Sequence, residues 1–272
     1  MSDVAVLPLT RALTVASSDS GGGAGLQADL KTFAALGVYG LCAVSAVTAQ
    51  NTVAVTAMEC LSPALLTAQL EAVFDDFPVE AVKIGLLGNK ANAEALADFM
   101  ERLDPRPPAV LDPVMVSAAG HTFLPPDAVE ALFRLMPLCR LTTPNIPEAE
   151  ALTGVKIADL DDCLKAAEAL KKLGAQDVLV KGGHAPGQKC VDLFFGADGP
   201  IWLTAPRVET KNDHGTGCSL SAAVAACLAR GETMEESVHL AKLYVKEGLK
   251  HGLSLGHGHG PLNHFYRLYD YK

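Results

Sequence analysis

The sequence lacks several features that would assign the protein to a class at once. No apolar run among its 272 residues approaches the roughly 20 residues that a membrane-spanning helix needs. Basic residues are fewer than acidic ones, 22 against 31, whereas a nucleic-acid footprint is built from clustered Lys and Arg. We therefore expect neither a membrane nor a nucleic acid as partner. A small-molecule substrate, including a small anion bound at a local site, stays compatible with this composition.

Targeting signals and paired cysteines are also missing. The first residues form neither a basic segment nor an apolar one, so we expect a cytoplasmic protein. The seven cysteines are odd in number, and no two are spaced as Cys-x-x-Cys, which is a common spacing in metal and redox sites. We interpret most of them as reduced core residues, which suits a reducing compartment.

Two common nucleotide-binding motifs are absent as well. The glycines of residues 21–25 do not form Gly-x-Gly-x-x-Gly in the required strand context. The closest match to a Walker A loop, residues 182–189, fails because Gln188 separates Gly187 from Lys189. The chain also has no linker, low-complexity tract or internal repeat, so we predict a single domain over residues 1–272.

What the sequence does contain is an alternation of strand-like and helix-like segments. Hydrophobic residues make up 49% of the chain and charged residues 19%, which is typical of a globular protein. We predict strands at 12–16, 41–47, 81–85, 109–112, 140–143, 177–181, 191–195 and 201–203, and helices at 24–36, 63–74, 91–103 and 127–136 and from Pro147, Leu160 and Ser219. Several strands are continuously apolar, as in a sheet buried on both faces. The pattern predicts a three-layer α/β fold with a mostly parallel central sheet flanked by helices.

A glycine-rich turn precedes the helix of small residues that starts near Ser219. The turn is Gly215-Thr216-Gly217-Cys218. Its glycines let the backbone turn N–H groups inward, and the helix adds its own unpaired N–H groups and the positive end of its dipole. We therefore predict an anion cradle, with Lys211 and the Cys218 thiol placed for a phosphate and a reacting hydroxyl. The alternative is a plain turn from a strand into a helix.

Polar residues follow several of the predicted strands, at Asp19, Gln50, Asp112, Asn145 and Lys181. Ligands of open α/β sheets bind at the carboxyl ends of the strands. Asp112 together with Glu148 would hold a hydrated Mg²⁺, because this ion prefers one or two carboxylates plus substrate phosphates. Such a set suits phosphoryl transfer, which needs positioning, charge neutralisation and a proton acceptor.

Each of these strand-end features also has a structural interpretation. Asp112 is a common turn or capping residue. Asn145 with Glu148 three residues later satisfies a helix capping box. Lys181 is followed by two glycines and fits an ordinary turn. The residues alone leave these alternatives open.

The motifs together give the chain a specific resemblance. They run in order along the sequence, at 12–16, 18–19, 22–33, 48–52, 83–85, 112–115, 143–148, 181–184, 214–218 and 256–261. In these stretches the chain resembles the hydroxymethylpyrimidine/phosphomethylpyrimidine kinases of thiamine synthesis, which belong to the ribokinase-like superfamily. The resemblance implies a ribokinase-like fold and a kinase that uses ATP and Mg²⁺.

The resemblance also implies roles for individual positions. Asp19, Ala24 and Gln50 would line a pyrimidine pocket, with Leu86 in its wall. Gln50 is the most informative of these, because a carboxamide offers a donor and an acceptor side by side to a ring nitrogen and its neighbouring amine. The other implied positions fall into three groups. The phosphate cradle consists of Gly215, Thr216, Gly217 and Cys218. The residues on the nucleotide side are Asn145, Lys181, Thr210 and Lys211, of which Lys181 also serves catalysis, and the carboxylates on the metal side are those of Asp112 and Glu148.

Cys218 carries the most specific expectation. Sugar kinases of the superfamily have Asp at this position as general base, and the pyrimidine kinases resemble this chain in having Cys. A free thiol has a pKa near 8.5, and a helix N-terminus favours the thiolate, whereas nearby phosphates and Asp213 oppose it. We expect Cys218 to accept a proton; the alternative is a small residue that only shapes the phosphate cradle.

The resemblance thus implies transfer of a phosphoryl group from ATP to 4-amino-5-hydroxymethyl-2-methylpyrimidine and then to its monophosphate. The nearest alternative is a pyridoxal kinase, which phosphorylates an alcohol by the same chemistry. A non-catalytic binding protein that keeps the fold is a second alternative, disfavoured by the intact Gly-x-Gly-Cys cradle and the strand-end polar residues. The resemblance further implies a homodimer.

Overall fold

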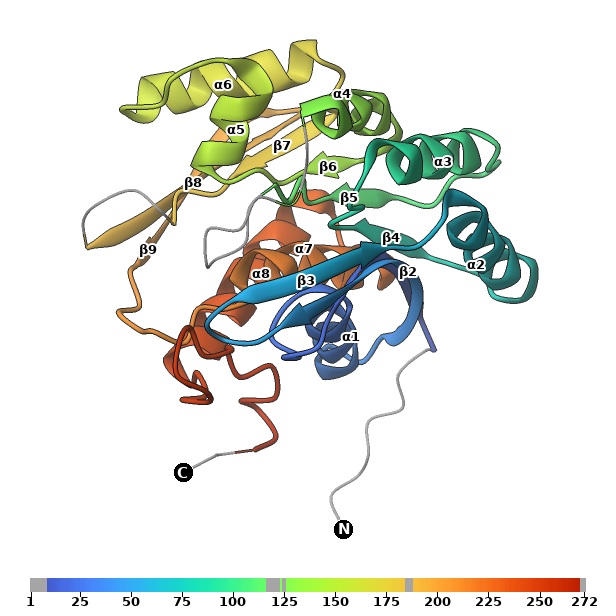
Figure 1. Ribbon diagram of the computed structural model, residues 1–272. Helices are drawn as coiled ribbons and strands as arrows, with labels where there is room; N and C mark the ends of the chain where they lie inside the picture. Colours follow the sequence, from blue (N-terminus) through green and yellow to red (C-terminus); the bar gives the residue numbers. More distant parts are fainter. Residues whose placement is uncertain (1–8, 116–122, 124–125, 184–187, 270–272) are drawn as a thin grey trace.

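A sheet of nine strands runs through the protein, whose computed structural model describes residues 9–115, 123, 126–183 and 188–269 (Figure 1). The strand order is β3-β2-β1-β4-β5-β6-β7-β8-β9. The strands are β1 (Arg11–Asp19), β2 (Tyr39–Gln50), β3 (Val55–Cys60), β4 (Ala81–Ile84), β5 (Ala109–Leu111), β6 (Leu141–Thr142), β7 (Asp177–Val180), β8 (Lys189–Gly196) and β9 (Gly199–Pro206). Six neighbouring strands pair in parallel, in the order β2, β1, β4, β5, β6 and β7. Strands β3, β8 and β9 are antiparallel additions at the two edges. The predicted mostly parallel sheet is confirmed.

Helices cover both faces of this sheet (Figure 1). One layer packs α1 (Gly25–Ala35), α7 (Thr216–Ala229) and α8 (Met234–Lys250) against the sheet. The other layer contains α2 (Pro63–Asp76), α3 (Lys90–Glu101), α4 (Pro126–Leu135), the short 3₁₀ helix η1 (Met136–Leu138), α5 (Ile146–Thr153) and α6 (Leu160–Lys172). The two hydrophobic cores on opposite faces of one sheet make the three layers that the sequence predicts.

The central strands divide their side chains between the two cores. In β7, Val178 and Val180 pack with the α2–α6 layer, whereas Leu179 packs with the α1/α7/α8 layer. In β4, Ala81 packs with the α1/α7/α8 layer and Val82 with the α2–α6 layer. This alternation follows from the two-residue period of a strand. The same period directs Lys83 of β4 toward α1, where its ammonium meets Asp29.

Most helix starts are capped by side chains. Ser62, Asn89, Asn145, Asp159 and Thr233 accept hydrogen bonds from backbone N–H groups at the starts of α2, α3, α5, α6 and α8. Helices α1 and α7 differ, since neither Ala24 nor Gly215 caps its helix with a side chain. A helix start without such a cap keeps backbone N–H groups for a ligand.

Two elements were not anticipated from the sequence. Strand β3 contains only exposed and half-buried residues and has no apolar run to reveal it. Helix α8 is capped by the Thr233 capping box and packs on α7. In addition, β2 continues to Gln50, although a loop was expected from residue 48. Pairing with β3 explains this extension, because residues 46–50 of β2 bond to that strand.

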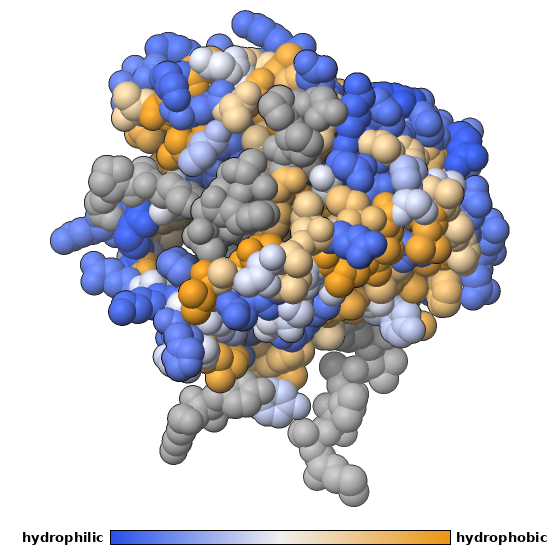
Figure 2. All heavy atoms as spheres, viewed as in Figure 1, coloured by the Kyte–Doolittle hydropathy of each residue, from blue (hydrophilic) through white to orange (hydrophobic). Residues whose placement is uncertain are grey.

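Hydrophobic side chains also remain on the surface. In Figure 2 they gather over the face that carries β3 and the start of α2, while the outer helices of that face are mostly hydrophilic. Among the exposed large hydrophobic residues, Val47 belongs to β2, Val53 to the β2–β3 connection and Leu65 to α2. Within the described ranges, no helix has the length and apolar character that crossing a membrane requires.

Candidate active site

A cavity of about 760 Å³ opens at the carboxyl ends of the parallel strands. Nearly all of the sequence-predicted site residues line it, although they come from segments far apart in the chain. They are Asp19, Ala24, Gln50, Leu86, Asp112, Asn145, Glu148, Lys181, Thr210, Gly215, Thr216, Gly217 and Cys218. This is the location expected for a ligand of a doubly wound sheet.

Lys211 is the predicted residue that the cavity lining does not include. It lies on an exposed bend, where its carbonyl accepts a hydrogen bond from the backbone of Gly260. Its neighbour Thr210 does line the cavity. The expectation that Lys211 sits beside the transferred phosphate therefore has no support from its position. His184, part of the motif that begins at Lys181, lies outside the described residues.

The start of α7 forms the cradle. Gly215 adopts the left-handed region with φ of 81°, and a Cβ there would lie 1.8 Å from the carbonyl oxygen of Gly23. Glycine is thus required both by the backbone angle and by the close approach of the glycine loop after β1. The small side chains of α7 are buried, with residues 222–226 wholly inaccessible, so the helix packs closely on the sheet and on α1. Its first turn is held rigidly at the cavity.

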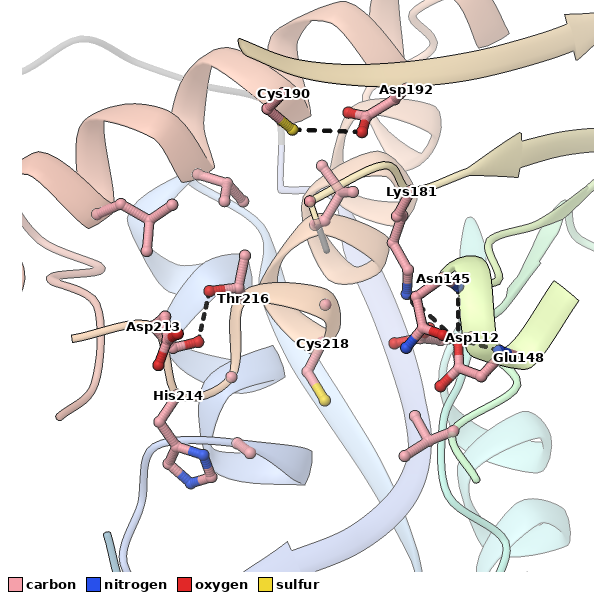
Figure 3. A pocket seen from close by; sticks show the side chains of 18 of the residues that line it. Asp112, Asn145, Glu148, Lys181, Cys190, Asp192, Asp213, His214, Thr216 and Cys218 are labelled. Atoms are coloured by element: carbon pink, nitrogen blue, oxygen red, sulfur yellow. Dashed lines mark hydrogen bonds and ion pairs between the residues drawn. The ribbon is translucent and has the colours of Figure 1, made fainter. Parts of the chain in front are cut away.

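Cys218 extends from this first turn into the cavity (Figure 3). Burial raises the pKa of its thiol to about 11, although the Lys83 ammonium and a backbone hydrogen bond from Gly25 act in the opposite direction. Cys218 is accordingly a neutral thiol at pH 7 in the ligand-free protein. The expectation that the helix N-terminus would favour the thiolate is corrected here, because desolvation outweighs it.

Across the cavity from Cys218, three charged side chains form a cluster (Figure 3). The Lys181 ammonium lies 2.7 Å from Oδ1 of Asp112 and 4.0 Å from Oε2 of Glu148. Burial opposes ionisation of Asp112, but Lys181 and Lys83 outweigh it and hold its pKa below the ordinary value. Burial raises the pKa of Glu148 to about 7, with Lys181 opposing the shift. The Asp112 carboxylate is thus ionised at pH 7, whereas Glu148 titrates near neutrality.

Glu148 also belongs to the capping box of α5. Its Oε2 accepts from the backbone N–H of Asn145 at 2.8 Å, and Asn145 Oδ1 accepts from the Glu148 N–H at 2.9 Å. The structural alternative for this pair is therefore confirmed. The two interpretations are compatible, because the box fixes the Glu148 carboxylate at the cavity wall.

The donor set of Asp112 and Glu148 fits Mg²⁺. Both side chains are almost wholly buried, yet both line the cavity where a phosphate chain would enter. The described residues contain no group of three His, Cys, Asp or Glu side chains arranged for a metal ion. Two carboxylates suffice for a Mg²⁺ that takes its other ligands from water and phosphate oxygens.

At the opposite end of the cavity, Asp19 organises the glycine loop. Its Oδ1 accepts from the N–H of Gly21, and its Oδ2 accepts from the N–H groups of Gly23 and Ala24. The same Oδ2 lies 2.9 Å from Nε2 of His214. Burial opposes ionisation, but these partners, His214 first, hold the pKa of Asp19 below its ordinary value. Its contribution to the pocket is to shape the loop.

His214 is a site residue that the sequence reasoning did not single out. It is buried, lines the cavity and lies with its ring against the glycine loop, where a Cβ on Gly23 would come within 2.3 Å of its Cδ2. Its Nε2 is also 3.4 Å from Nε2 of Gln50, and Thr48 Oγ1 lies 3.3 Å from Gln50 Oε1. The hydrogen on His214 Nε2 is directed to Asp19 at 2.9 Å, and the Thr48 hydroxyl donates to the Ser18 carbonyl at 2.9 Å. The Gln50 carboxamide therefore lies between these two side chains without a strong hydrogen bond to either. A histidine inside the glycine motif was the available signal.

A second missed residue is Lys83. It stands within an otherwise apolar strand, is wholly buried and yet lines the cavity. A lysine in the middle of a buried strand was the signal that could have identified it. The cavity lining also includes a further group of residues that the sequence reasoning missed. In this group, Asp192 of β8 contacts Cys190 and pairs with Lys242 of α8.

Comparison with known proteins identifies relatives over nearly the whole chain. The model of the phosphomethylpyrimidine kinase family matches residues 19–263. The hydroxymethylpyrimidine/phosphomethylpyrimidine kinase of Rhizobium meliloti is 51% identical over 260 residues, which cover 94% of this chain and 97% of that protein.

Two solved structures share the architecture. Phosphomethylpyrimidine kinase from Clostridium difficile 630 superposes with a TM-score of 0.78 at 42% identity, covering 89% of this chain and 100% of that one. Pyridoxal kinase from Staphylococcus aureus in complex with AMP-PCP and pyridoxal superposes with a TM-score of 0.87 at 33% identity, covering 95% of this chain and 94% of that one. These similarities confirm the predicted ribokinase-like α/β fold, and the chain belongs to the phosphomethylpyrimidine kinase family.

Proposed function

We propose that this protein transfers the γ-phosphoryl group of ATP to 4-amino-5-hydroxymethyl-2-methylpyrimidine, and a second phosphoryl group to the resulting monophosphate, in thiamine biosynthesis. The observation that carries the proposal is the arrangement of one cavity. The uncapped start of α7 and the Cys218 thiol face an Asp112–Lys181–Glu148 cluster within it. Family membership supports the choice of substrate.

The nucleotide phosphates would lie between α7 and the charged cluster. Lys181 contributes a cation there, and Asn145 and Thr210 also line the cavity. Asp112 and Glu148 would hold Mg²⁺, which when bound neutralises charge on the phosphates. The AMP-PCP complex of the Staphylococcus aureus relative supports an ATP site in this fold.

The pyrimidine would lie at the other end of the cavity. Gln50, at the end of β2, offers a donor and an acceptor that match the ring nitrogen and exocyclic amine of an aminopyrimidine. Ala24 and Leu86 add apolar surface to the lining of the same cavity. His214 and Thr48 flank the carboxamide, so the group that would select the acceptor is confined between two side chains.

The chemistry needs one proton acceptor when the acceptor is an alcohol. The Cys218 thiol would first lose its proton to a base in solution. As the hydroxymethyl oxygen then forms its bond to the γ-phosphorus and the bond to the leaving ADP oxygen breaks, the hydroxyl proton passes to the Cys218 thiolate. The backbone N–H groups at the start of α7 stabilise the charge on the transferred group. With the monophosphate as acceptor, the attacking oxygen is already ionised, and no proton has to be removed.

An assay of ATP consumption with three acceptors tests this proposal. Wild type and Gln50→Ala are each given hydroxymethylpyrimidine, its monophosphate and pyridoxal, together with Mg²⁺. We expect both pyrimidines to be phosphorylated well and pyridoxal poorly, and Gln50→Ala to lose the preference. The pyridoxal kinase relatives among the solved structures make pyridoxal the sharpest competitor. A clear preference for pyridoxal would reject the thiamine assignment.

The resemblance also supports two further proposals, a homodimer and a cytoplasmic location. Exposed hydrophobic residues of β2, the β2–β3 connection and α2 are compatible with a subunit contact, but they do not define one. Sedimentation equilibrium at micromolar concentration tests the dimer directly. A mass near 28.4 kDa, that of a single chain, would contradict it.

A further inference from the structure

A buried ion pair, of which one member lines the cavity, is not used by the proposed mechanism. The ammonium of Lys83, in the central strand β4, donates to Oδ2 of Asp29 in α1 at 2.8 Å. Thr14 of β1 donates its hydroxyl to the same oxygen at 2.6 Å. Both charged side chains are wholly inaccessible to solvent. A charged pair thus occupies a place in the core where apolar side chains would otherwise pack.

Such a pair is not explained by stability. Removing two charges from water is expensive, and a buried ion pair is often no more stabilising than well-packed hydrophobic residues of similar volume. The pair is also incompletely bonded, because Oδ1 of Asp29 has no hydrogen-bond partner among the residues that the structure describes. The arrangement therefore calls for a functional reason.

The position of Lys83 points to the reaction site. Although its side chain is buried, it lines the same cavity as Cys218. Two residues further along, a Cβ on Gly85 would lie 2.6 Å from the Lys83 Nζ, so glycine at this position leaves room for the ammonium group. Lys83 is also the cation that most strongly favours the charged form of Cys218.

Charged groups from four elements act on Cys218. Lys83 of β4 and Lys181 after β7 are the cations, whereas Asp29 of α1 and Asp112 after β5 are the anions. Lys181 is already paired with Asp112 at 2.7 Å, so these two charges largely offset each other. Lys83 and Asp29 oppose each other in the same way, and the lysine has the larger effect on the thiol.

We propose that Lys83, held in place by Asp29, is a positioning residue whose buried ammonium is the counter-charge for a Cys218 thiolate during phosphorylation of the hydroxymethyl group. The inference rests on the proposed function. Cys218 first releases its thiol proton to solvent base, and the thiolate then accepts the proton of the acceptor hydroxyl as the new oxygen–phosphorus bond forms. Lys83 remains protonated throughout, and Asp29 limits how far the thiolate is favoured.

Two variants isolate the charge of Lys83 while leaving no buried carboxylate unpaired. Asp29→Asn keeps the lysine, and Lys83→Met/Asp29→Asn removes it in the same background. The control is Arg11→Met/Glu80→Gln, which removes an ion pair at the opposite end of β1. Circular dichroism and urea unfolding establish that each variant is folded. The pH dependence of Cys218 alkylation by iodoacetamide is then followed by mass spectrometry of the peptide that contains it.

We expect alkylation at pH 8 to be fastest in Asp29→Asn, intermediate in wild type and the control, and slowest in the double variant. The two test variants should differ by about tenfold or more, which corresponds to about one unit of thiol pKa. A general loosening of the fold would accelerate alkylation in both test variants instead. Equal rates in the two folded test variants would overturn the proposal.

Turnover supplies the second readout. In the double variant, kcat for hydroxymethylpyrimidine should fall about tenfold relative to Asp29→Asn and recover as the pH is raised, following the thiolate fraction. Turnover of the monophosphate, whose attacking oxygen needs no base, should change by less than about threefold. Equal losses with both acceptors contradict the role of Lys83. If wild type phosphorylates neither acceptor, the proposed function fails, and the alkylation order still decides the electrostatic inference.

Discussion

Two lysine–aspartate pairs line or underlie the same cavity, and they differ mainly in access to it. Lys83 and Asp29 lie 2.8 Å apart with both side chains wholly buried. Lys181 and Asp112 lie 2.7 Å apart, but the lysine side chain keeps 12% of its exposure and Glu148 lies beside it. The comparison shows that the same chemical pair can be placed for two different roles. In the roles proposed above, the Lys83–Asp29 pair (the sealed pair) would act on Cys218 by its charges alone, whereas the Lys181–Asp112 pair (the open pair) would exchange its partners for phosphate oxygens.

The difference in access follows from strand position. Lys83 is the third residue of the four in β4, so α1 covers its side chain. Lys181 directly follows β7 and therefore lies at the carboxyl edge of the sheet, where the cavity opens. A shift of one or two residues along a parallel strand is enough to convert a core position into a site position.

The largest effect that would separate the two pairs is on stability. Lys83→Met leaves the Asp29 carboxylate buried without its cation, so we expect a loss of about 3–5 kcal/mol in the free energy of unfolding. Urea denaturation measures it. Lys83→Met/Asp29→Asn should recover most of the loss, because neither charge then remains. A loss below about 1 kcal/mol in Lys83→Met would show that water reaches the Lys83–Asp29 pair in solution.

The second expected effect reverses this pattern for the open pair. Lys181→Met should lower kcat by about 10²–10³-fold, as removal of one preorganised charge at a transferring phosphoryl group typically does. Its stability should fall by less than about 2 kcal/mol, because Glu148, whose pKa burial raises to about 7, can take up a proton when the ammonium is lost. Steady-state kinetics and urea denaturation test the two parts. Lys165→Met, on an exposed pair of α6, is the matched control. A kcat within tenfold of wild type would remove Lys181 from the mechanism.

A third expected effect is a pH dependence that belongs to the open pair alone. Burial raises the pKa of Glu148 from 4.5 to about 7. In the proposed Mg²⁺ site the ion would bind the ionised form of Glu148. We therefore expect kcat/KM for MgATP to rise about tenfold between pH 6 and 8, and Glu148→Gln to flatten this limb of the profile. A Glu148→Gln profile that keeps the same midpoint would assign the limb to another group.

The same shift in Glu148 has a consequence for stability. Folding raises its pKa, so the protonated form is the one that the folded state favours. Its contribution to the free energy of unfolding is fully present below about pH 4.5 and is lost as the pH rises through about 7. Urea denaturation of wild type and Glu148→Gln across this range measures the difference, which should shrink toward low pH.

The smallest expected effects concern the hydroxyl that supports each pair. Thr14→Val removes the hydrogen bond to Asp29 and should cost about 1–2 kcal/mol of stability, with KM for MgATP unchanged. Ser221→Ala removes the bond to Asp112 Oδ2 and should raise KM for MgATP by about threefold to tenfold, with stability lowered by less than about 1 kcal/mol. The two variants are compared in one titration series. If both change the same quantity, the two pairs do not have separate tasks.

The local motifs were predictable because their physics is local. The glycine requirement at Gly215, the helix that follows it, and the Asn145–Glu148 capping box depend on neighbouring residues only. The alternation of strands and helices likewise predicted the parallel sheet and its ligand-binding edge. Strand β3 was not predictable, because its half-exposed residues take their conformation from pairing with β2.

The sequence by itself determined the fold class, the cradle at the start of α7 and the set of polar residues at the strand ends, because each follows from short-range periodicity, glycine chemistry or motif spacing. Only the tertiary structure decided that Cys218 is desolvated into a neutral thiol, that Lys83 and Asp29 meet beneath it, and that Lys211 lies outside the cavity. The desolvation of a buried group and the electrostatic field acting on it depend on every element packed around that group. No single stretch of sequence contains this information.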